Sequence, residues 1–375
     1  PSPNARGLSA VTRMGLNRFC DLYTPRQLLS LITLCKIVHD LKAALPGEMS
    51  AGFRQAIIVC LAVSVSRLAD FNSSFCVLNS VGGRGVKNTF ARQALSIVWD
   101  YMETNPFNEV GANWEAGIEA TLGNIRYGTA IPTTGNVHQC SATMHPLANS
   151  IAQALITDPP YYDAIPYSDL SDYFYVWLKR MLGAELPGLF ESNLTPKDEE
   201  AIWNPSRIYS KTGKPKDIAF YECQMQKALE SAGQYVAPNG IGIVVFANKA
   251  TASWEAILQA LVNANWVISG SWPLDTERTA RISAVGQARL QSSVHIVCRP
   301  RENLEGTLRI EEIGDWRDVL QALPKRIHEW MPRLAEEGVV GADAIFACIG
   351  PALEIFSRYS RVEKASGVQV MLREY

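Results

Sequence analysis

The stretch IAQALITDPPYYDAIPYSDLSDYFYVWLKR, residues 151–180, joins an apolar run to an aromatic-rich segment through a turn of unusual composition. Residues 151–157 read as a strand, because this short apolar run is stopped by Asp-Pro-Pro at 158–160. Residues 170–183 repeat apolar side chains at helical spacing. The order strand, turn, helix is typical of an open α/β sheet, in which ligands gather beyond the carboxyl ends of the strands.

Helical spacing and short apolar runs recur on both sides of this stretch. Near-continuous apolar strands that alternate with amphipathic helices favour a mainly parallel sheet covered on both faces, so the predicted fold class is α/β. We predict helical segments at residues 1–130, a core at 131–300 that holds the sheet, and a helical cap at 301–375. Helices are expected at 25–45, 51–71, 88–105, 217–236, 251–265, 315–330 and 342–362, and further strands at 137–142, 241–247, 266–272 and 292–299.

Composition narrows the class of protein. With 47% hydrophobic and 19% charged residues, and no apolar run judged long enough for a membrane span, the chain is predicted to be a soluble cytoplasmic protein with no membrane partner. The net charge of -2 means that any nucleic-acid binding must come from a local basic surface. The eight cysteines are scattered without zinc-ligand spacing, which indicates buried thiols in a reducing compartment and no metal site.

The turn after residue 157 suits recognition of an amine. Prolines stiffen the backbone and leave its carbonyls free to accept, so the Asp158 carboxylate and the Pro159 carbonyl can face two N–H hydrogens. Such acceptors help to localise the lone pair of an exocyclic amine on a nucleobase. The ring of Tyr161 offers a platform on which a flipped base stacks, worth roughly 1–3 kcal/mol.

These residues carry a family resemblance. D-P-P-Y at 158–161 resembles the catalytic motif of amino-group DNA methyltransferases, in its adenine-N6 form. The longer strings TDPPYYDAIPYSDLSDYFYVWLKR, DLYTPRQLLSL, GIGIVVFANK, SSVHIVCRPR and FACIGPALEIFSRYS resemble a narrower group, the prokaryotic adenine-specific DNA methylases with a DUF1156 domain and an inserted zinc ribbon. The resemblance covers nearly the whole chain and corresponds to the central-to-C-terminal part of those methylases.

The resemblance implies a Rossmann-like methyltransferase that uses S-adenosylmethionine to methylate adenine N6 in double-stranded DNA, within a restriction-modification or phage-defence system. It gives Asp158, Pro159, Pro160 and Tyr161 the catalytic roles of amine binding and base stacking, with Asp158 also beside the cofactor. Tyr162 is expected to be a second contact to the base or the strand.

Two further sets of residues come with alternatives. The resemblance matches Tyr23, Thr24 and Pro25 to an element that contacts the methionine end of the cofactor; a helix cap by Thr24 with proline at the first helical position explains the same residues. The loop at 204–217 carries Arg207, Lys211 and Lys214, which suit phosphate contacts, or else form an ordinary solvated surface.

The expected glycine-rich cofactor loop is not evident. GGRG at 82–85 follows a helical pattern, and Gly240 and Gly242 precede or enter their strand, so all read as turn glycines. Another chain, or a segment beyond this one, would then supply the loop. The alternatives are a DNA-binding or complex-forming fragment without turnover, or a methyltransferase that acts on cytosine N4, RNA or a protein glutamine amide.

Overall fold

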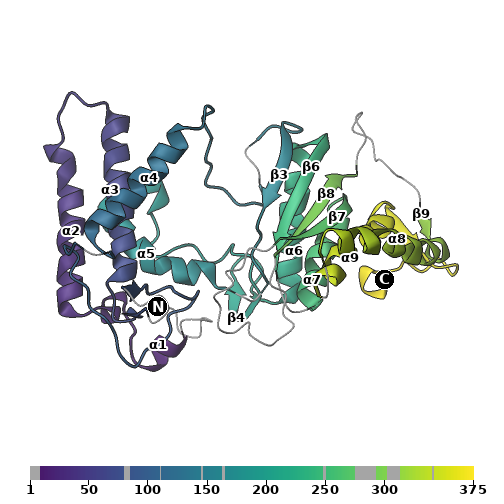
Figure 1. The fold of residues 1–375 in the computed structure, drawn as a ribbon, viewed down its shortest axis with the longest axis horizontal. Helices are drawn as coiled ribbons and strands as arrows, with labels where there is room; N and C mark the ends of the chain where they lie inside the picture. Colours follow the sequence, from purple (N-terminus) through teal and green to yellow (C-terminus); the bar gives the residue numbers. More distant parts are fainter. Residues whose placement is uncertain are drawn as a thin grey trace. The chain divides into compact units, whose positions relative to one another are not determined.

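The protein divides into two compact units (Figure 1), seen in a computed structural model. The helical unit comprises Pro1–Asn136 and Ile165–Glu200, and the sheet unit comprises Val137–Ala164 and Ala201–Tyr375. The division departs from the predicted segments, because residues 165–200 belong with the N-terminal helices. The structure describes residues 9–79, 85–109, 111–144, 147–162, 165–247, 251–274, 293–301, 313–339 and 342–375.

The helical unit forms where the sequence carries helix-start signals. Thr24 accepts a hydrogen bond from the Gln27 amide at the start of α2, and Ser50 accepts one from the Phe53 amide at the start of α3. Both helices therefore begin within a residue of where the periodicity predicts them. The elements are α1 (Ser9–Arg13), α2 (Pro25–Ala44), α3 (Ala51–Phe71), β1 (Val77–Leu78), β2 (Val86–Lys87), α4 (Trp114–Thr129) and α5 (Tyr167–Leu182), with short 3-10 turns at Phe19–Leu22 and Pro187–Leu189.

Helix α5 packs with the N-terminal helices because its aromatic face is buried there. Tyr173 and Trp177 are almost fully buried in one core with Leu31 and Leu68. The Tyr173 hydroxyl donates to the Ala69 carbonyl at 2.7 Å, which also satisfies the polar end of that ring. The aromatic run after the Asp-Pro-Pro turn is therefore core packing.

The sheet unit holds a four-stranded mixed sheet in the order β3-β6-β8-β7. Strand β3 runs parallel to β6, whereas β8 is antiparallel to both β6 and β7. The prediction of a mainly parallel sheet was therefore wrong for the described strands. Apolar runs report burial on both faces, which a central antiparallel strand such as β8 shares with a parallel one. The strands are β3 (Ala152–Thr157), β6 (Val236–Phe246), β7 (Trp266–Leu274) and β8 (Ser293–Pro300).

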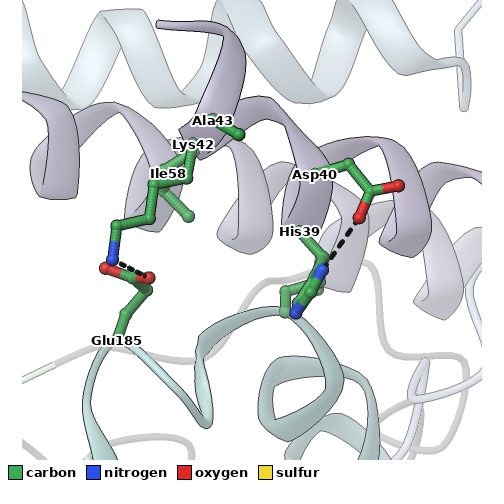
Figure 2. A pocket seen from close by; sticks show the side chains of 7 residues that line it. His39, Asp40, Lys42, Ala43, Ile58 and Glu185 are labelled. Carbon is green, nitrogen blue, oxygen red and sulfur yellow. Dashed lines mark hydrogen bonds and ion pairs between the residues drawn. The ribbon is translucent and has the colours of Figure 1, made fainter. Parts of the chain in front are cut away.

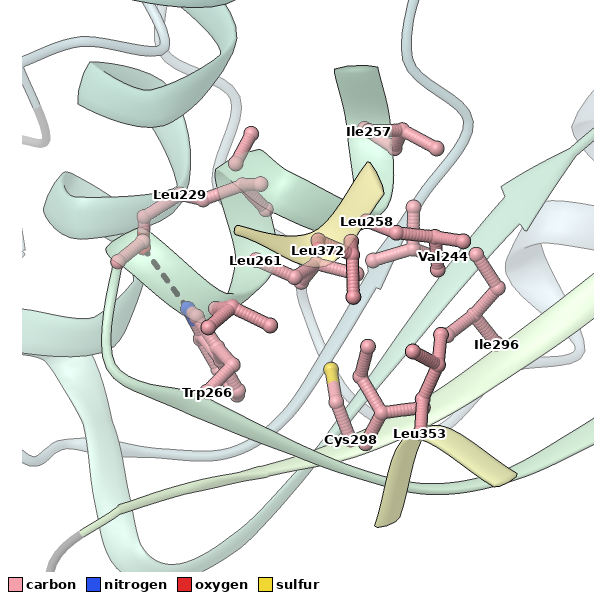
Figure 3. Packing of buried hydrophobic residues seen from close by; sticks show 14 of the residues in the cluster. Leu229, Val244, Ile257, Leu258, Leu261, Trp266, Ile296, Cys298, Leu353 and Leu372 are labelled. Atoms are coloured by element: carbon pink, nitrogen blue, oxygen red, sulfur yellow. Dashed lines mark hydrogen bonds between the residues drawn. The ribbon is translucent and has the colours of Figure 1, made fainter. Parts of the chain in front are cut away.

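Helices from two parts of the chain pack on this sheet and share its core (Figure 3). The Trp266 indole of β7 donates to the Leu229 carbonyl of α6 at 3.0 Å, and Leu353 of α9 lies in the same cluster. The C-terminal helices are therefore part of the sheet unit and not a separate cap. They are α6 (Ile218–Tyr235), α7 (Thr251–Asn263), α8 (Trp316–Glu336) and α9 (Ala342–Ser357), with a short parallel pair β9 (Ile313–Asp315) and β10 (Arg361–Glu363) and a final 3-10 turn, Leu372–Glu374.

Two contacts hold α9 against the sheet unit. A side chain on Gly350 would place its Cβ 2.3 Å from backbone atoms of Gly270 and Ser271, and the Gly350 amide donates to the Ser271 hydroxyl at 2.8 Å. Arg301, 2% exposed, donates to the Val262 carbonyl at the end of α7 and to the Ser357 carbonyl at the end of α9. The negative ends of two helices thus stabilise a buried cation.

Some elements differ from the sequence prediction. Residues 88–105 form no helix, and 137–142 form no strand. In 88–105 only scattered positions such as Thr89 and Leu95 are buried, so no continuous apolar face meets a core, and Trp99 is fully exposed. Helix α4 was not predicted, although Asn113 caps it. The loop at 204–217 is a hairpin of β4 (Asn204–Tyr209) and β5 (Lys214–Lys216).

Candidate functional site: the turn after strand β3

The turn that begins at Asp158 follows the carboxyl end of β3 directly. Strands β3 and β6 are parallel, and β7 runs in the same direction because both β6 and β7 are antiparallel to β8. The three strands therefore end at the same edge of the sheet, which is where α/β proteins bind ligands. The prediction that places the turn at the end of a strand is confirmed for residues 152–157.

Two acceptors in the turn are unused by the fold. Asp158 is exposed, and neither it nor the Pro159 carbonyl has a hydrogen-bond partner among the described residues. The next carbonyl behaves differently, since that of Pro160 accepts from the Tyr162 amide at 3.0 Å and from the Tyr221 hydroxyl at 2.8 Å. The protein thus fixes the turn through Pro160 and leaves the exposed Asp158 carboxylate without a partner, next to the buried Pro159, whose carbonyl is also without one among the described residues.

Tyr161 is held beside the end of β6. Its half-buried ring meets the ring of Phe246 edge to face, with centroids 5.4 Å apart, and Phe246 in turn meets Trp254 of α7 at 5.0 Å. Such T-shaped pairs fix ring orientation. The ring therefore has a defined position at the end of β6.

Tyr162 does not have the role predicted for it. Its side chain is 6% exposed and packs against Trp203 and Tyr221, with ring centroids 5.4 and 5.1 Å away. The backbone of Tyr162 has φ of 58°, in the left-handed region that non-glycine residues rarely adopt. The structure places Tyr162 in the core of the sheet unit, where its ring is not available to a base or a DNA strand.

Tyr23, Thr24 and Pro25 belong to the helical unit, whereas the Asp-Pro-Pro turn belongs to the sheet unit. The Tyr23 hydroxyl accepts from the Trp177 indole at 2.9 Å, and burial together with the neighbouring Tyr173 raises the pKa of Tyr23 well above its ordinary value. Thr24 caps α2, and Pro25 is its first residue. The helix-cap interpretation therefore accounts for these residues.

An acid of the chain already occupies the N-terminus of α2. Glu103 accepts from the Thr24 hydroxyl at 2.7 Å and pairs with Arg26, and hydrogen bonds from Arg26 and Thr24 hold the pKa of Glu103 below its ordinary value. A cofactor carboxylate would repel the Glu103 carboxylate at this helix end. The residues of this element, as arranged here, do not fit the methionine end of S-adenosylmethionine.

The basic residues predicted to contact DNA lie on the β4–β5 hairpin. Arg207 is in β4, Lys211 lies in the turn, and Lys214 begins β5; Lys211 and Lys214 are exposed. The structure thus replaces the predicted loop by a two-stranded ribbon. The glycines considered for the cofactor loop are not in turns where the structure describes them in full: Gly240 and Gly242 lie inside β6. Residues 82–84 are outside the described residues.

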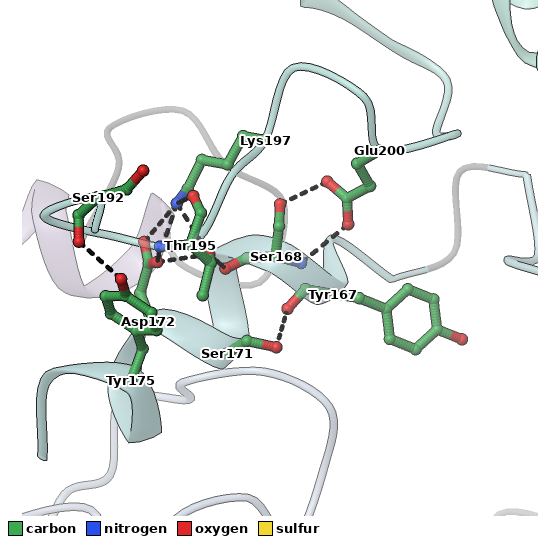
Figure 4. Close-up of polar contacts among 9 residues, drawn as sticks. All are labelled: Tyr167, Ser168, Ser171, Asp172, Tyr175, Ser192, Thr195, Lys197 and Glu200. Carbon is green, nitrogen blue, oxygen red and sulfur yellow. Dashed lines mark hydrogen bonds and ion pairs between the residues drawn. The ribbon is translucent and has the colours of Figure 1, made fainter. Parts of the chain in front are cut away.

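Sequence reasoning missed a polar network on α5 (Figure 4). Asp172, fully buried, lies 2.7 Å from the Lys197 ammonium and accepts from the amide and hydroxyl of Thr195, while the amide and hydroxyl of Ser168 donate to Glu200. The network ties residues 195–200 to the first turns of α5. Its only signal in the sequence is an acid inside an apolar helix face.

The helical unit also contains an open hollow of about 640 Å³ (Figure 2). Its polar side chains pair with one another: Lys42 with Glu185 at 2.5 Å, and His39 with Asp40 at 3.0 Å. No polar group of the hollow is thus prepared for a ligand, and we assign it no role. It is lined by His39, Asp40, Lys42, Ala43, Ile58, Met181 and Glu185.

Comparison with protein-family models, curated proteins and solved structures finds no match to the chain. Among the described residues, α3 is the single helix whose length and hydropathy would suffice to cross a membrane. The core helix of a soluble protein meets the same criterion. Ile58, Val65 and Leu68 of α3 are buried in the core of the helical unit.

Proposed function

We propose that the chain is the amine-binding part of an S-adenosylmethionine-dependent DNA methyltransferase that acts on N6 of a flipped adenine. The observation that carries the proposal is the exposed Asp158 carboxylate at the carboxyl end of β3, which has no partner among the described residues and is followed by a Pro159 carbonyl that is buried and equally unused. An amino group has two hydrogens to donate, and two adjacent acceptors match that number. The exposure of Asp158 leaves the position open to a base.

The residues of the turn have distinct roles in this proposal. Asp158 and the Pro159 carbonyl accept the two N–H bonds of the amine, which draws its lone pair out of conjugation with the base. The Tyr161 ring, fixed by Phe246, stacks on the base and compensates part of the cost of unstacking it from the duplex. The Pro160 carbonyl, held by Tyr221, keeps the turn rigid, which favours catalysis by positioning. S-adenosylmethionine would supply the methyl group.

The finer fold belongs to the same proposal. We infer a Rossmann-like core that continues beyond β3, because β3 pairs only with β6 among the described strands and its Ile156 is 72% exposed. Further strands on that side would bring the glycine-rich loop, supplied by another chain or another segment. The enzyme would work in the cytoplasm, in restriction-modification or phage defence.

The proposal is tested with the chain together with the chain or segment that supplies the glycine-rich loop: isothermal titration of S-adenosylmethionine is followed by transfer of labelled methyl groups to adenine-containing duplex DNA. Asp158→Ala should abolish transfer, while Asp318→Ala, which removes an exposed acid on α8 of the same unit, should leave it unchanged. Transfer that survives Asp158→Ala would refute the amine-binding role.

A second candidate is a DNA-binding or complex-forming component that does not turn over alone. The position of Glu103 at the N-terminus of α2 favours it, because the chain then lacks the predicted contact to the donor. DNA binding without any binding of S-adenosylmethionine would support this candidate.

The same transfer assay on cytosine-only and RNA substrates separates adenine N6 from the alternative acceptors.

A further inference from the structure

The β4–β5 hairpin is rich in basic residues, although the chain as a whole carries a net negative charge. Residues 204–217 contain four basic residues, Arg207, Lys211, Lys214 and Lys216, and one acid, Asp217, whereas the whole chain has a net charge of -2. Lys216 is buried, so the surface charge comes from the other three. A local basic surface of this kind attracts polyanions even when the total charge does not. Whether these side chains can contact a polyanion depends on how the hairpin is held.

Both ends of the hairpin contact α6, since Tyr209 lies next to the turn and Lys216 at the opposite end. Tyr209 is 8% exposed and lies 4.8 Å from the ring of Phe220, while the ammonium of the buried Lys216 lies over the same ring at 5.0 Å. Asp217 then caps α6 by accepting from the Phe220 amide at 2.9 Å. The hairpin is therefore an ordered ribbon that contacts α6 at both of its ends.

The tip of the ribbon is also ordered. The amide of Gly213, which has φ of 66°, donates to the Tyr209 carbonyl at 2.9 Å, and this closes a tight turn. Lys211 lies within the turn and Lys214 directly after it, and both are exposed. The turn thus presents two ammonium groups on a short, rigid arm.

The same first turn of α6 holds the Asp-Pro-Pro turn. Phe220 contacts Tyr209 and Lys216 of the ribbon, and its neighbour Tyr221 donates its hydroxyl to the Pro160 carbonyl at 2.8 Å. The Tyr221 ring also packs against Tyr162. Consecutive residues of one helix therefore fix the distance between the basic ribbon and the amine-binding acceptors.

From this arrangement we propose that the β4–β5 ribbon grips the phosphates of the duplex DNA strand whose base enters the Asp158 turn, with Lys211 and Lys214 as the contacts at its tip. The inference rests on the proposed function, because it takes DNA as the substrate. Phosphate contacts fix register without reading sequence. The ribbon would hold the DNA backbone at a fixed distance from the flipped base. Binding of the strand by the ribbon would then offset part of the free-energy cost of flipping the base.

The test is the salt dependence of DNA binding by the full chain, measured by fluorescence anisotropy with a labelled duplex. Each phosphate contact contributes about 0.9 to the slope of log K against log salt concentration. The double variant Lys211→Gln/Lys214→Gln should therefore reduce that slope by about 2. The matched control, Lys227→Gln/Lys325→Gln, removes two exposed lysines of the same unit from α6 and α8 and should leave the slope unchanged.

Three results would overturn the proposal: no binding of duplex DNA by the unaltered chain, an unchanged slope in the double variant, or an equal loss in the control. Tighter binding of duplex RNA than of DNA would replace the inferred partner. Asp158→Ala should keep the full slope, since it removes no phosphate contact. If the unaltered chain, with the glycine-rich loop supplied, transfers no methyl group while its salt slope still depends on Lys211 and Lys214, the proposed function is refuted. The ribbon then remains a DNA contact.

Discussion

Replacing Gly350 by alanine tests how closely α9 lies against strand β7. The added Cβ would lie 2.3 Å from the Gly270 carbonyl carbon and the Ser271 nitrogen, well inside contact distance. Helix α9 would have to move by about 1 Å, and overpacking of this kind costs about 1–3 kcal/mol. The shift would also weaken the 2.8 Å hydrogen bond from the Gly350 amide to Ser271, worth about 1 kcal/mol.

The higher helix propensity of alanine offsets part of this loss of stability. Alanine is favoured over glycine inside a helix by about 1 kcal/mol. The steric and hydrogen-bond losses exceed this gain, so we expect Gly350→Ala to lower the free energy of unfolding by about 2 kcal/mol. Gly233→Ala in α6 provides the control, since its Cβ would meet only ordinary contacts at 3.8 Å or more, and we expect no loss of stability or a small gain.

Urea titration followed by circular dichroism measures both variants, with hydrogen exchange of the β7 amides to locate the effect. The two substitutions share one chemistry and belong to one unit, so the difference between them isolates the close approach of α9. A Gly350→Ala protein as stable as the unaltered chain would show that α9 is not seated on Gly270 as described.

Three further outcomes follow from single contacts. Glu103→Gln should lower stability by about 1 kcal/mol at neutral pH, because it weakens the bonds at the start of α2; since the folded pKa of Glu103 lies below its ordinary 4.5, the difference should vanish as pH falls through that lower value in acid urea titrations. Tyr221→Phe should cost about 1 kcal/mol by the same titration and slow methyl transfer, because the Pro160 carbonyl loses one donor. Arg301→Met should lower the thermal midpoint, at a cost of about 2 kcal/mol, because the last carbonyls of α7 and α9 lose their donor while remaining buried; an unchanged midpoint would contradict the bridging role.

The sequence predicted those parts of the fold that local signals control. Caps at Thr24 and Ser50 located two helices, and the Asp-Pro-Pro stop located both β3 and the candidate site. The exposure of Asp158 is consistent with the local chemistry of the turn, whereas the burial of Pro159 was not predicted from it.

Features that depend on distant residues could not be predicted in this way. The direction of β8 is set by its partners and not by its own apolar pattern. The burial of Tyr162 depends on Trp203 and Tyr221, and the acid at the start of α2 comes from Glu103, far along the chain. In 88–105 the spacing was helical, but the positions that became buried were too scattered to give a helix a continuous face to pack.

The pairing of β3 with β6 has a consequence for synthesis of the protein. Thr157 lies beside Val244, so the strand before the Asp158 turn leaves the ribosome about ninety residues ahead of its partner. At roughly 5–20 residues per second, this delay lasts on the order of 4–18 seconds. During that time an apolar strand with open edges is exposed to other nascent chains, and the Asp158 turn reaches its final surroundings late in folding.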